Sequence, residues 1–306
     1  MSKIPHNSTL GLLRTEEVDS KYQLLDVMTT AELLHAMNEG DAQVPQAIAL
    51  VLPAIEQAIE SVVKRMSRGG RLIYVGAGTS GRLGVLDAAE CGPTFSVTED
   101  QVVGYIAGGD RALRHAVEGA EDDFLAGVSQ MESAAVNSLD SVVGIAASGR
   151  TPYVLGALTY GKKVGALTIG LTSNPHSEIS KQVDHPIEID SGPELLAGST
   201  RLKSGTAQKL VLNMISTITM VRLGKTFGNL MVDLQVTNEK LQDRALRIIE
   251  KATGASREQS SQALLDSGEN VKIAILMLLL EVDAPVARRR LEAAANRVRQ
   301  ALGDQN

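Results

Sequence analysis

The stretch RLIYVGAGTSGRL (residues 71–83) determines the fold that we expect for this chain. Residues 71–75 form a short apolar run rich in β-branched and aromatic side chains, which is typical of a buried strand. Glycines then provide a tight turn, and a helical pattern begins at Ser80. A strand that leads through such a turn into a helix exposes free backbone N–H groups, and the helix dipole there favours negative charge. We therefore expect an anion-binding loop that includes Gly78, Thr79 and Ser80.

The same stretch matches G-x-G-x-x-G, the fingerprint of dinucleotide-binding folds. That fingerprint requires an acidic residue at the end of the next strand, where it holds the ribose. The next predicted strand, 102–107, ends in glycines; Glu99 and Asp100 precede it and Asp110 lies beyond the glycines. An oxidoreductase that uses a nicotinamide cofactor is therefore a disfavoured alternative, and we predict no cofactor.

A second loop of similar design follows the apolar run at residues 141–147. It reads SGRT (148–151) and leads into a helix, for which Ser148 or Thr151 is a suitable cap. The carboxyl ends of strands in an open parallel sheet lie together, and ligands bind there. Helix capping explains either loop alone. Two such loops predict a shared phosphate or other anionic ligand, bound by Ser80, Ser148, Gly149 and Thr151.

Composition excludes several classes of protein. The chain has 306 residues, with 3% aromatic residues, no Trp and a formal net charge of −6, so its core is aliphatic and nucleic-acid binding is not expected. Cys91 is the single cysteine, which excludes a disulfide framework within the chain. Residues 1–15 lack the apolar core of a signal peptide, and the apolar run 273–280 is too short to span a bilayer. We expect a cytoplasmic protein that does not bind membranes.

Strand and helix patterns alternate through the middle of the chain, which indicates a parallel sheet with helices on both faces. The predicted strands are 71–75, 102–107, 141–147, 164–170 and 185–189, and the predicted helices between them are 80–91, 110–119, 122–136 and 151–162. We expect three parts: an N-terminal arm with a short helix (1–43), an α/β domain (44–224) and a small C-terminal all-helical domain (225–306).

A long polar loop at residues 191–206 carries several hydroxyls and two cations. Loops of this length without secondary structure are often functional. Ser199 and Lys203 are candidate contacts for a phosphate or a carboxylate, and a solvated surface loop is the alternative. The His, Cys, Asp and Glu residues have no spacing typical of metal ligands, so we predict no metal site.

Six segments together carry a family resemblance: GAGTSGRLG (76–84), AEC (89–91), AVEGAED (116–122), IAASGRTPY (145–153), GTAQKLVLNM (205–214) and FGNLMVD (227–233). In this order, over nearly the whole chain, they resemble the bacterial N-acetylmuramic acid 6-phosphate etherases. The sheet part is similar to the sugar isomerase (SIS) fold of phosphosugar-binding proteins, a flavodoxin-like sandwich. The helical tail is similar to the small C-terminal domain of that family. The regulatory protein of animal glucokinase, another phosphosugar binder, is also similar.

The resemblance implies that N-acetylmuramic acid 6-phosphate loses D-lactate from its C3 ether and gains water, giving N-acetylglucosamine 6-phosphate. It implies a metal-independent homodimer that serves the recycling or catabolism of cell-wall amino sugars. The acid/base glutamate of the family matches Glu90, and a second functional glutamate matches Glu121. A phosphosugar-sensing regulatory protein without catalysis is the alternative, because it would use the same phosphate loops.

The position of Glu90 suits a proton-transfer group. Leu83, Leu86 and Glu90 share one helix face, and that face is expected to be buried; burial and a place near the helix C-terminus would both raise the pKa of Glu90. Ser80 and Glu90 are ten residues apart, about 15 Å along a regular helix, which is too far for one hexose phosphate to touch both. Either the helix breaks early, or Glu90 serves a site that another subunit completes.

Overall fold

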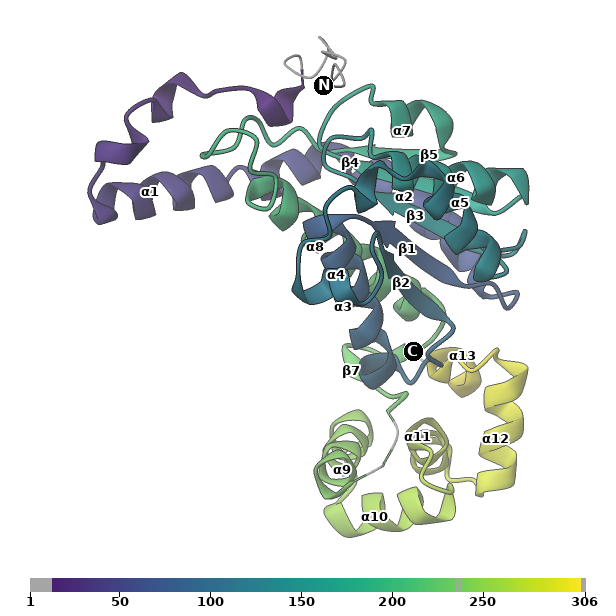
Figure 1. Cartoon of the computed structure of the whole chain (residues 1–306). Coiled ribbons are helices and arrows are strands. Elements are labelled where there is room, and N and C mark those ends of the chain that lie inside the picture. Colours follow the sequence, from purple (N-terminus) through teal and green to yellow (C-terminus); the bar gives the residue numbers. More distant parts are fainter. Residues whose placement is uncertain (1–12, 235, 237, 304–306) are drawn as a thin grey trace. The chain divides into compact units, whose positions relative to one another are not determined.

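The computed structural model describes residues 13–234, 236 and 238–303. The chain separates into two compact units, each of which is formed by two segments (Figure 1). The first unit consists of Met1–Ala88 and Asp100–Ile215, and the second of Ala89–Glu99 and Ser216–Asn306.

The first unit contains a parallel five-stranded sheet of order β2-β1-β3-β4-β5, which confirms the predicted fold class. The strands are β1 (Leu72–Gly76), β2 (Val102–Ile106), β3 (Ser141–Ile145), β4 (Leu167–Thr172) and β5 (His185–Glu188). Every residue of β1, β3 and β4 is buried, as expected for a parallel sheet covered on both faces. Gly76 is level with Ile106 on one side and Ile145 on the other, so three strands end together. β4 begins later than predicted because Gly165, at φ +81°, ends the preceding helix.

Helices cover both faces of this sheet (Figure 1). They are α2 (Val44–Met66), α3 (Gly78–Phe95), α4 (Arg111–Arg114), α5 (Phe124–Ser133), α6 (Pro152–Lys163), α7 (Glu178–Gln182) and α8 (Lys203–Arg222). Ile73 of β1 belongs to a buried cluster that includes Leu158 of α6. The next residue, Tyr74, faces the other way, toward α3, where a Cβ on Gly84 would lie 3.0 Å from its own Cβ. Alternate side chains of β1 thus pack against different helices.

Helices α5 and α6 approach each other through glycines. A Cβ on Gly127 would lie 1.9 Å from the carbonyl oxygen of Tyr153, and a Cβ on Gly156 would lie 2.0 Å from that of Phe124. This close packing brings the start of α6 beside the start of α5 and the 3₁₀ turn η5 (Ala120–Asp122). The helix predicted at 110–119 is wrong in its second half, since α4 ends at Arg114.

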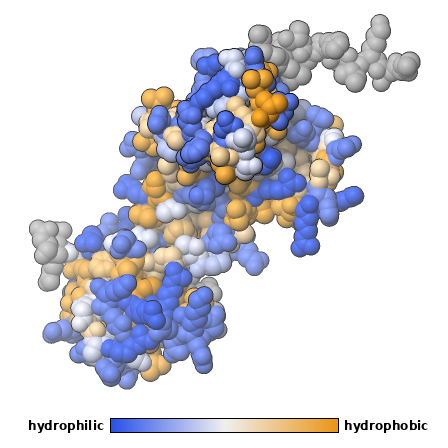
Figure 2. All heavy atoms as spheres, turned by 90° about the vertical axis from the view of Figure 1, so that its left-hand side faces the viewer, coloured by the Kyte–Doolittle hydropathy of each residue, from blue (hydrophilic) through white to orange (hydrophobic). Residues whose placement is uncertain are grey.

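The N-terminal arm is described from Leu13 onward, and residues 1–12 lie outside the described residues. It contains η2 (Arg14–Glu16), η3 (Ser20–Tyr22), η4 (Leu25–Val27) and α1 (Thr30–Asp41). The arm and the first part of α2 expose large apolar side chains, each at least 65% accessible: Val18, Leu24, Val27, Leu34 and Leu50. Figure 2, which faces this side, shows orange hydrophobic residues among the hydrophilic ones. The described part of the arm therefore leaves apolar surface that no other described part of the chain covers.

The stretch Thr30–Met66 is long and apolar enough, by length and composition alone, to cross a membrane, and 33% of its most apolar window is buried. α2 supplies one face of this stretch to the core, through Ile48, Ile55, Ile59 and Val62. The packing of α2 within the first unit accounts for the apolar residues on that face. The run 273–280, singled out from the sequence, lies in a shorter helix of the second unit.

The second unit confirms the predicted C-terminal helical region. Besides the ends of α3 and α8, its described residues form a short hairpin and a set of helices: β6 (Thr226–Phe227), β7 (Leu230–Met231), α9 (Glu239–Thr253), α10 (Arg257–Asp266), α11 (Val271–Leu280), α12 (Ala284–Ala293) and α13 (Val298–Leu302). Its core includes Ile249, Leu264, Ile275 and Leu291. The boundaries predicted from the sequence, 1–43, 44–224 and 225–306, stay a prediction.

Candidate active site

The first loop connects β1 to α3 and is as tight as predicted. A Cβ on Gly76 would lie 2.7 Å from the Gly81 nitrogen, and a Cβ on Gly81 would lie 2.8 Å from the Gly76 carbonyl oxygen, so glycine is needed at both positions. Ser80 is buried, and its hydroxyl donates a hydrogen bond of 2.9 Å to Oε1 of Gln208 in α8. Gln208 is not among the site residues predicted from the sequence, although it lies in one of the family-like segments. Gly205 of α8 lies beside Thr79, so this loop packs against the start of α8.

The second loop connects β3 to α6. Gly149 adopts φ +69°, where a side chain would be strained, and a Cβ there would lie 2.3 Å from the Cβ of Ser177. Thr151 occupies the N-cap position of α6, but its hydroxyl makes no capping hydrogen bond. Helix capping alone therefore does not account for Thr151, and its side chain lines a cavity instead. Burial raises the pKa of Tyr153, in the first turn of α6, to about 12, so its phenol stays neutral near pH 7.

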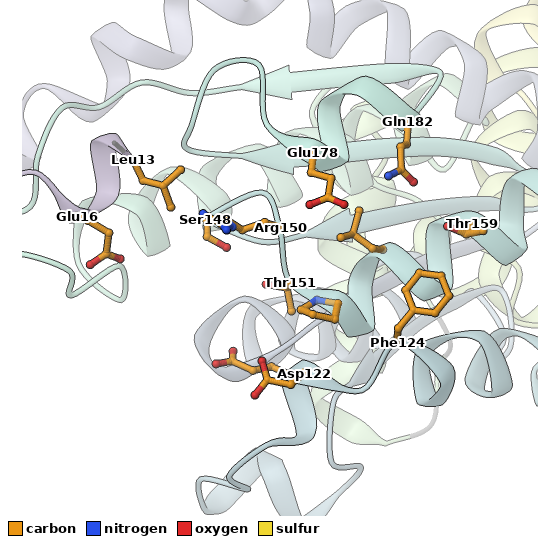
Figure 3. Close-up of a pocket in the computed structure, with 13 residues that line it drawn as sticks. Leu13, Glu16, Asp122, Phe124, Ser148, Arg150, Thr151, Thr159, Glu178 and Gln182 are labelled. Atoms are coloured by element: carbon orange, nitrogen blue, oxygen red, sulfur yellow. The ribbon is translucent and has the colours of Figure 1, made fainter. Parts of the chain in front are cut away.

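A cavity of about 770 Å³ opens at this second loop (Figure 3). Ser148 and Thr151 line it together with Glu121, so the structure brings three of the predicted site residues into one place. In Figure 3, Asp122 lies on the side of Thr151, whereas Glu178 and Gln182 lie on the opposite side. The other residues that line the cavity are Leu13, Glu16, Phe124, Arg150, Pro152, Leu155 and Thr159.

Glu121 reaches this cavity from a short turn between two of the predicted helices. It lies in the 3₁₀ turn η5, which follows Gly119 at φ +72°. Its side chain is exposed. The glycine-mediated contact between α5 and α6 holds this turn next to the loop that carries Ser148 and Thr151. A carboxylate beside a phosphate-type loop suits proton transfer on a bound phosphosugar.

Two expectations for Glu90 are wrong within this chain. α3 continues to Phe95 without a break, so Glu90 is not in its last turn and the C-terminal end of the dipole does not act on it. The helix face shared with Leu86 is not buried either, because Leu86 is 55% accessible and Glu90 is exposed. The early break of this helix, one of the two alternatives for the Ser80–Glu90 spacing, is ruled out because α3 runs from Gly78 to Phe95. Glu90 is not among the described residues that line the cavity.

Two charged residues, Glu194 and Lys203, stabilise the fold of the long loop before α8. The Lys203 side chain is buried and its ammonium donates to the carbonyl oxygen of Ser191 at 2.7 Å. The buried carboxylate of Glu194 accepts hydrogen bonds from the backbone N–H groups of Lys203 and Ser204, each at 2.9 Å, and so caps α8. Lys203 and Ser199 do not line the cavity with Ser148. Their roles as substrate contacts stay a prediction.

Within residues 13–234, 236 and 238–303, no group of three or more His, Cys, Asp and Glu side chains is arranged so that it could hold a metal ion. Cys91 is buried.

Comparisons with known proteins match domain models over parts of the chain and relatives over nearly its whole length. Residues 54–162 match the model of the glucokinase regulatory protein N-terminal SIS domain, 124–218 the SIS domain, and 228–272 the C-terminal lid domain of glucokinase regulatory protein. The N-acetylmuramic acid 6-phosphate etherase of Rubrobacter xylanophilus is 56% identical over 295 residues, covering 96% of this chain and 97% of that protein. The etherase of Streptomyces coelicolor is 51% identical over 306 residues, covering 99% and 98%. Etherase 1 of Bacillus licheniformis is 50% identical over 296 residues, covering 97% of each.

Among solved structures, the phosphoheptose isomerase of Neisseria gonorrhoeae aligns with 62% of this chain and 99% of its own, at 17% identity and a TM-score of 0.48. The family assignment rests on the sequence relatives.

Proposed function

The chain belongs to the N-acetylmuramic acid 6-phosphate etherase family, and we propose that it is a carbon–oxygen lyase acting on the C3 lactyl ether of N-acetylmuramic acid 6-phosphate. The products are N-acetylglucosamine 6-phosphate and D-lactate. The observation that carries the proposal is the cavity in which the loop of Ser148 and Thr151 faces the carboxylate of Glu121. In a cytoplasmic enzyme of this kind, the reaction serves recycling or catabolism of cell-wall amino sugars.

The chemistry needs a proton acceptor near C2. The open-chain aldehyde at C1 makes the C2 hydrogen acidic, because the carbanion delocalises as an enolate. A base removes that proton, a C2–C3 double bond forms, and the C3–O bond breaks while an acid protonates the departing lactate oxygen. Water then adds to C3 and C2 regains a proton. Carboxylates perform such steps in many enzymes.

The phosphate is proposed to bind at the second loop. α6 is twelve residues long and begins directly after Thr151, so its dipole and free N–H groups favour a dianion there. The hydroxyls of Ser148 and Thr151 face the same space. Energy from this remote contact positions C2 and C3 for reaction.

The assembly is proposed to be a homodimer in which Glu90 acts as the general acid in a site completed by a second copy. Glu90 is exposed, and the arm leaves apolar surface that the described residues do not cover. Glu121 is then a base available within the cavity, and the assignment of the two roles is open to test.

The experiment mixes two inactive variants, Glu90→Gln and the double variant Ser148→Ala/Thr151→Ala, and measures D-lactate released from N-acetylmuramic acid 6-phosphate. If Glu90 of one subunit acts in the site of the other subunit, one of the two sites in each heterodimer is intact and activity returns. The matched control mixes Glu121→Gln with the same double variant, which should give no recovery because these residues line one cavity. No recovery from the first mixture, despite proven heterodimers, would place Glu90 in its own chain's site.

The phosphosugar-sensing alternative predicts that the unaltered protein binds the sugar phosphate and releases no lactate. The same assay on the unaltered protein separates the two functions.

A further inference from the structure

The cavity has a one-sided distribution of charge. Four carboxylates line it, from Glu16, Glu121, Asp122 and Glu178, and Arg150 is the single cation among the described residues of its wall. The proposed substrate brings two more anionic groups, a phosphate and the carboxylate of the lactyl ether. Anions buried without a partner are costly, and acidic neighbours add repulsion. A cation is therefore needed wherever the lactyl carboxylate lies.

Arg150 is available for that task. Unlike Arg71, which is paired with Asp140, and Arg82, whose Nε donates to a backbone carbonyl oxygen, Arg150 makes no hydrogen bond or ion pair with the described residues. It is half-buried. The ammonium of Lys203, a candidate contact from the sequence, donates its hydrogen bond to the carbonyl oxygen of Ser191.

The backbone that carries Arg150 is held in place on both sides. The Gly149 carbonyl oxygen accepts from the N–H of Ile179 at 2.9 Å, and the Thr151 carbonyl oxygen accepts from the N–H of Leu155 at 3.0 Å. Figure 3 shows the Arg150 side chain lying beside Ser148 within the cavity. The guanidinium thus extends from the phosphate loop on a three-carbon stem, which separates it from the loop backbone.

We propose that Arg150 binds the lactyl carboxylate and so makes the site prefer the lactyl ether over the same sugar phosphate without it. The inference rests on the proposed function. The phosphate already has the N–H groups, hydroxyls and dipole of α6, whereas the described residues of the cavity wall offer no other cation to the carboxylate on C3. A planar guanidinium matches a carboxylate through two parallel hydrogen bonds.

The test compares two ligands that differ only in the lactyl group. In Arg150→Gln, kcat/KM for lactate release from N-acetylmuramic acid 6-phosphate should fall about 10- to 100-fold, the effect of losing a charge-assisted pair. The dissociation constant of N-acetylglucosamine 6-phosphate, measured by calorimetry, should change less than about threefold, because its contacts do not involve the carboxylate. Arg150→Lys should fall between, since lysine keeps the charge and loses the planar fork.

Lys163→Gln is the matched control, because it removes one positive charge from the exposed far end of α6. It should leave both quantities near those of the unaltered protein. If Arg150→Gln weakens both ligands in parallel, Arg150 serves the phosphate or the loop, and the proposal is wrong. If it changes neither, Arg150 is no contact at all. If the unaltered protein binds both sugars and releases no lactate, the proposed function fails independently of Arg150.

Discussion

Gly149→Ala should show how much of the candidate site depends on one backbone conformation. Gly149 lies between Ser148 and Arg150 at φ +69°. An alanine Cβ would lie 2.3 Å from the Cβ of Ser177 and 3.3 Å from the Cγ2 of Thr172. Rotation of the Ser177 side chain cannot relieve the closer contact, because the contact is with its Cβ. The loop or the start of α7 must move.

The magnitude follows from two costs. A non-glycine residue in the left-handed region costs about 1–2 kcal/mol, and overpacking a well-filled site adds about 1–3 kcal/mol. We expect Gly149→Ala to lower the free energy of unfolding by about 2–5 kcal/mol. Gly69→Ala is the control, because Gly69 has φ +89° and no atom within 4 Å of the added Cβ. It should lose about 1–2 kcal/mol.

The assay is urea unfolding of both variants, followed by lactate-release kinetics. The displaced loop carries the hydroxyls of Ser148 and Thr151, so KM of Gly149→Ala should rise about 10-fold or more, whereas Gly69→Ala should keep the parent KM. Equal stability losses in the two variants, with an unchanged KM for Gly149→Ala, would refute the packing of this loop against Ser177.

Two further predictions concern carboxylates. Burial alone would raise the pKa of Asp140, but hydrogen bonds from Arg71 and neighbouring N–H groups outweigh it and lower the pKa below the ordinary 3.8; its stabilisation is therefore present above pH 3.8 and lost as the pH falls through the lower folded pKa. Asp140→Asn should lose about 2–3 kcal/mol at pH 7 and show a flatter acid limb in urea unfolding. The control is Asp110→Asn, because Asp110 is exposed and its side chain makes no capping hydrogen bond; an unchanged acid limb for Asp140→Asn would contradict the prediction. Glu90→Gln should lower kcat about 10²- to 10⁴-fold with little change in KM. Lactate release at the parent rate would show that Glu90 is not the acid, whereas joint loss of lactate release and of solvent deuterium exchange at C2 would exchange its role with that of Glu121.

The sheet and the second loop could be predicted because short-range patterns determine them. The apolar runs at 71–75 and 141–147 lie in buried strands, and the glycines after them form the turns. In the parallel sheet, the carboxyl ends of neighbouring strands lie at one edge, so the loops that follow these strands lie close together. Glu121 could be selected through the family-like segment that contains it, without knowledge of its backbone.

Other features depend on contacts that a local pattern does not contain. The buried ammonium of Lys203 is satisfied by Ser191, twelve residues earlier, and its own N–H by Glu194. Lys203 therefore stabilises the loop in which it lies. The apolar spacing of Leu83 and Leu86 predicted burial of Glu90, but the residues that the structure describes leave Leu86 exposed on that face. Helical periodicity shows which residues share a face, and it does not show whether the partner surface belongs to the same chain.

Three helix N-termini explain why the cavity lies where it does. At α8, the carboxylate of Glu194 occupies the N-terminal N–H groups, so the chain supplies its own anion there. At α3, the hydroxyl of Ser80 is engaged with Gln208. At α6, the hydroxyl of Thr151 makes no capping bond and faces the cavity. A phosphate held at α6 leaves the rest of an open-chain sugar to extend through the cavity, whose wall includes Glu121. The same wall also carries Glu16, Asp122 and Glu178, so the mixing experiment decides whether the second proton-transfer group comes from this wall or is the exposed Glu90 of a second copy.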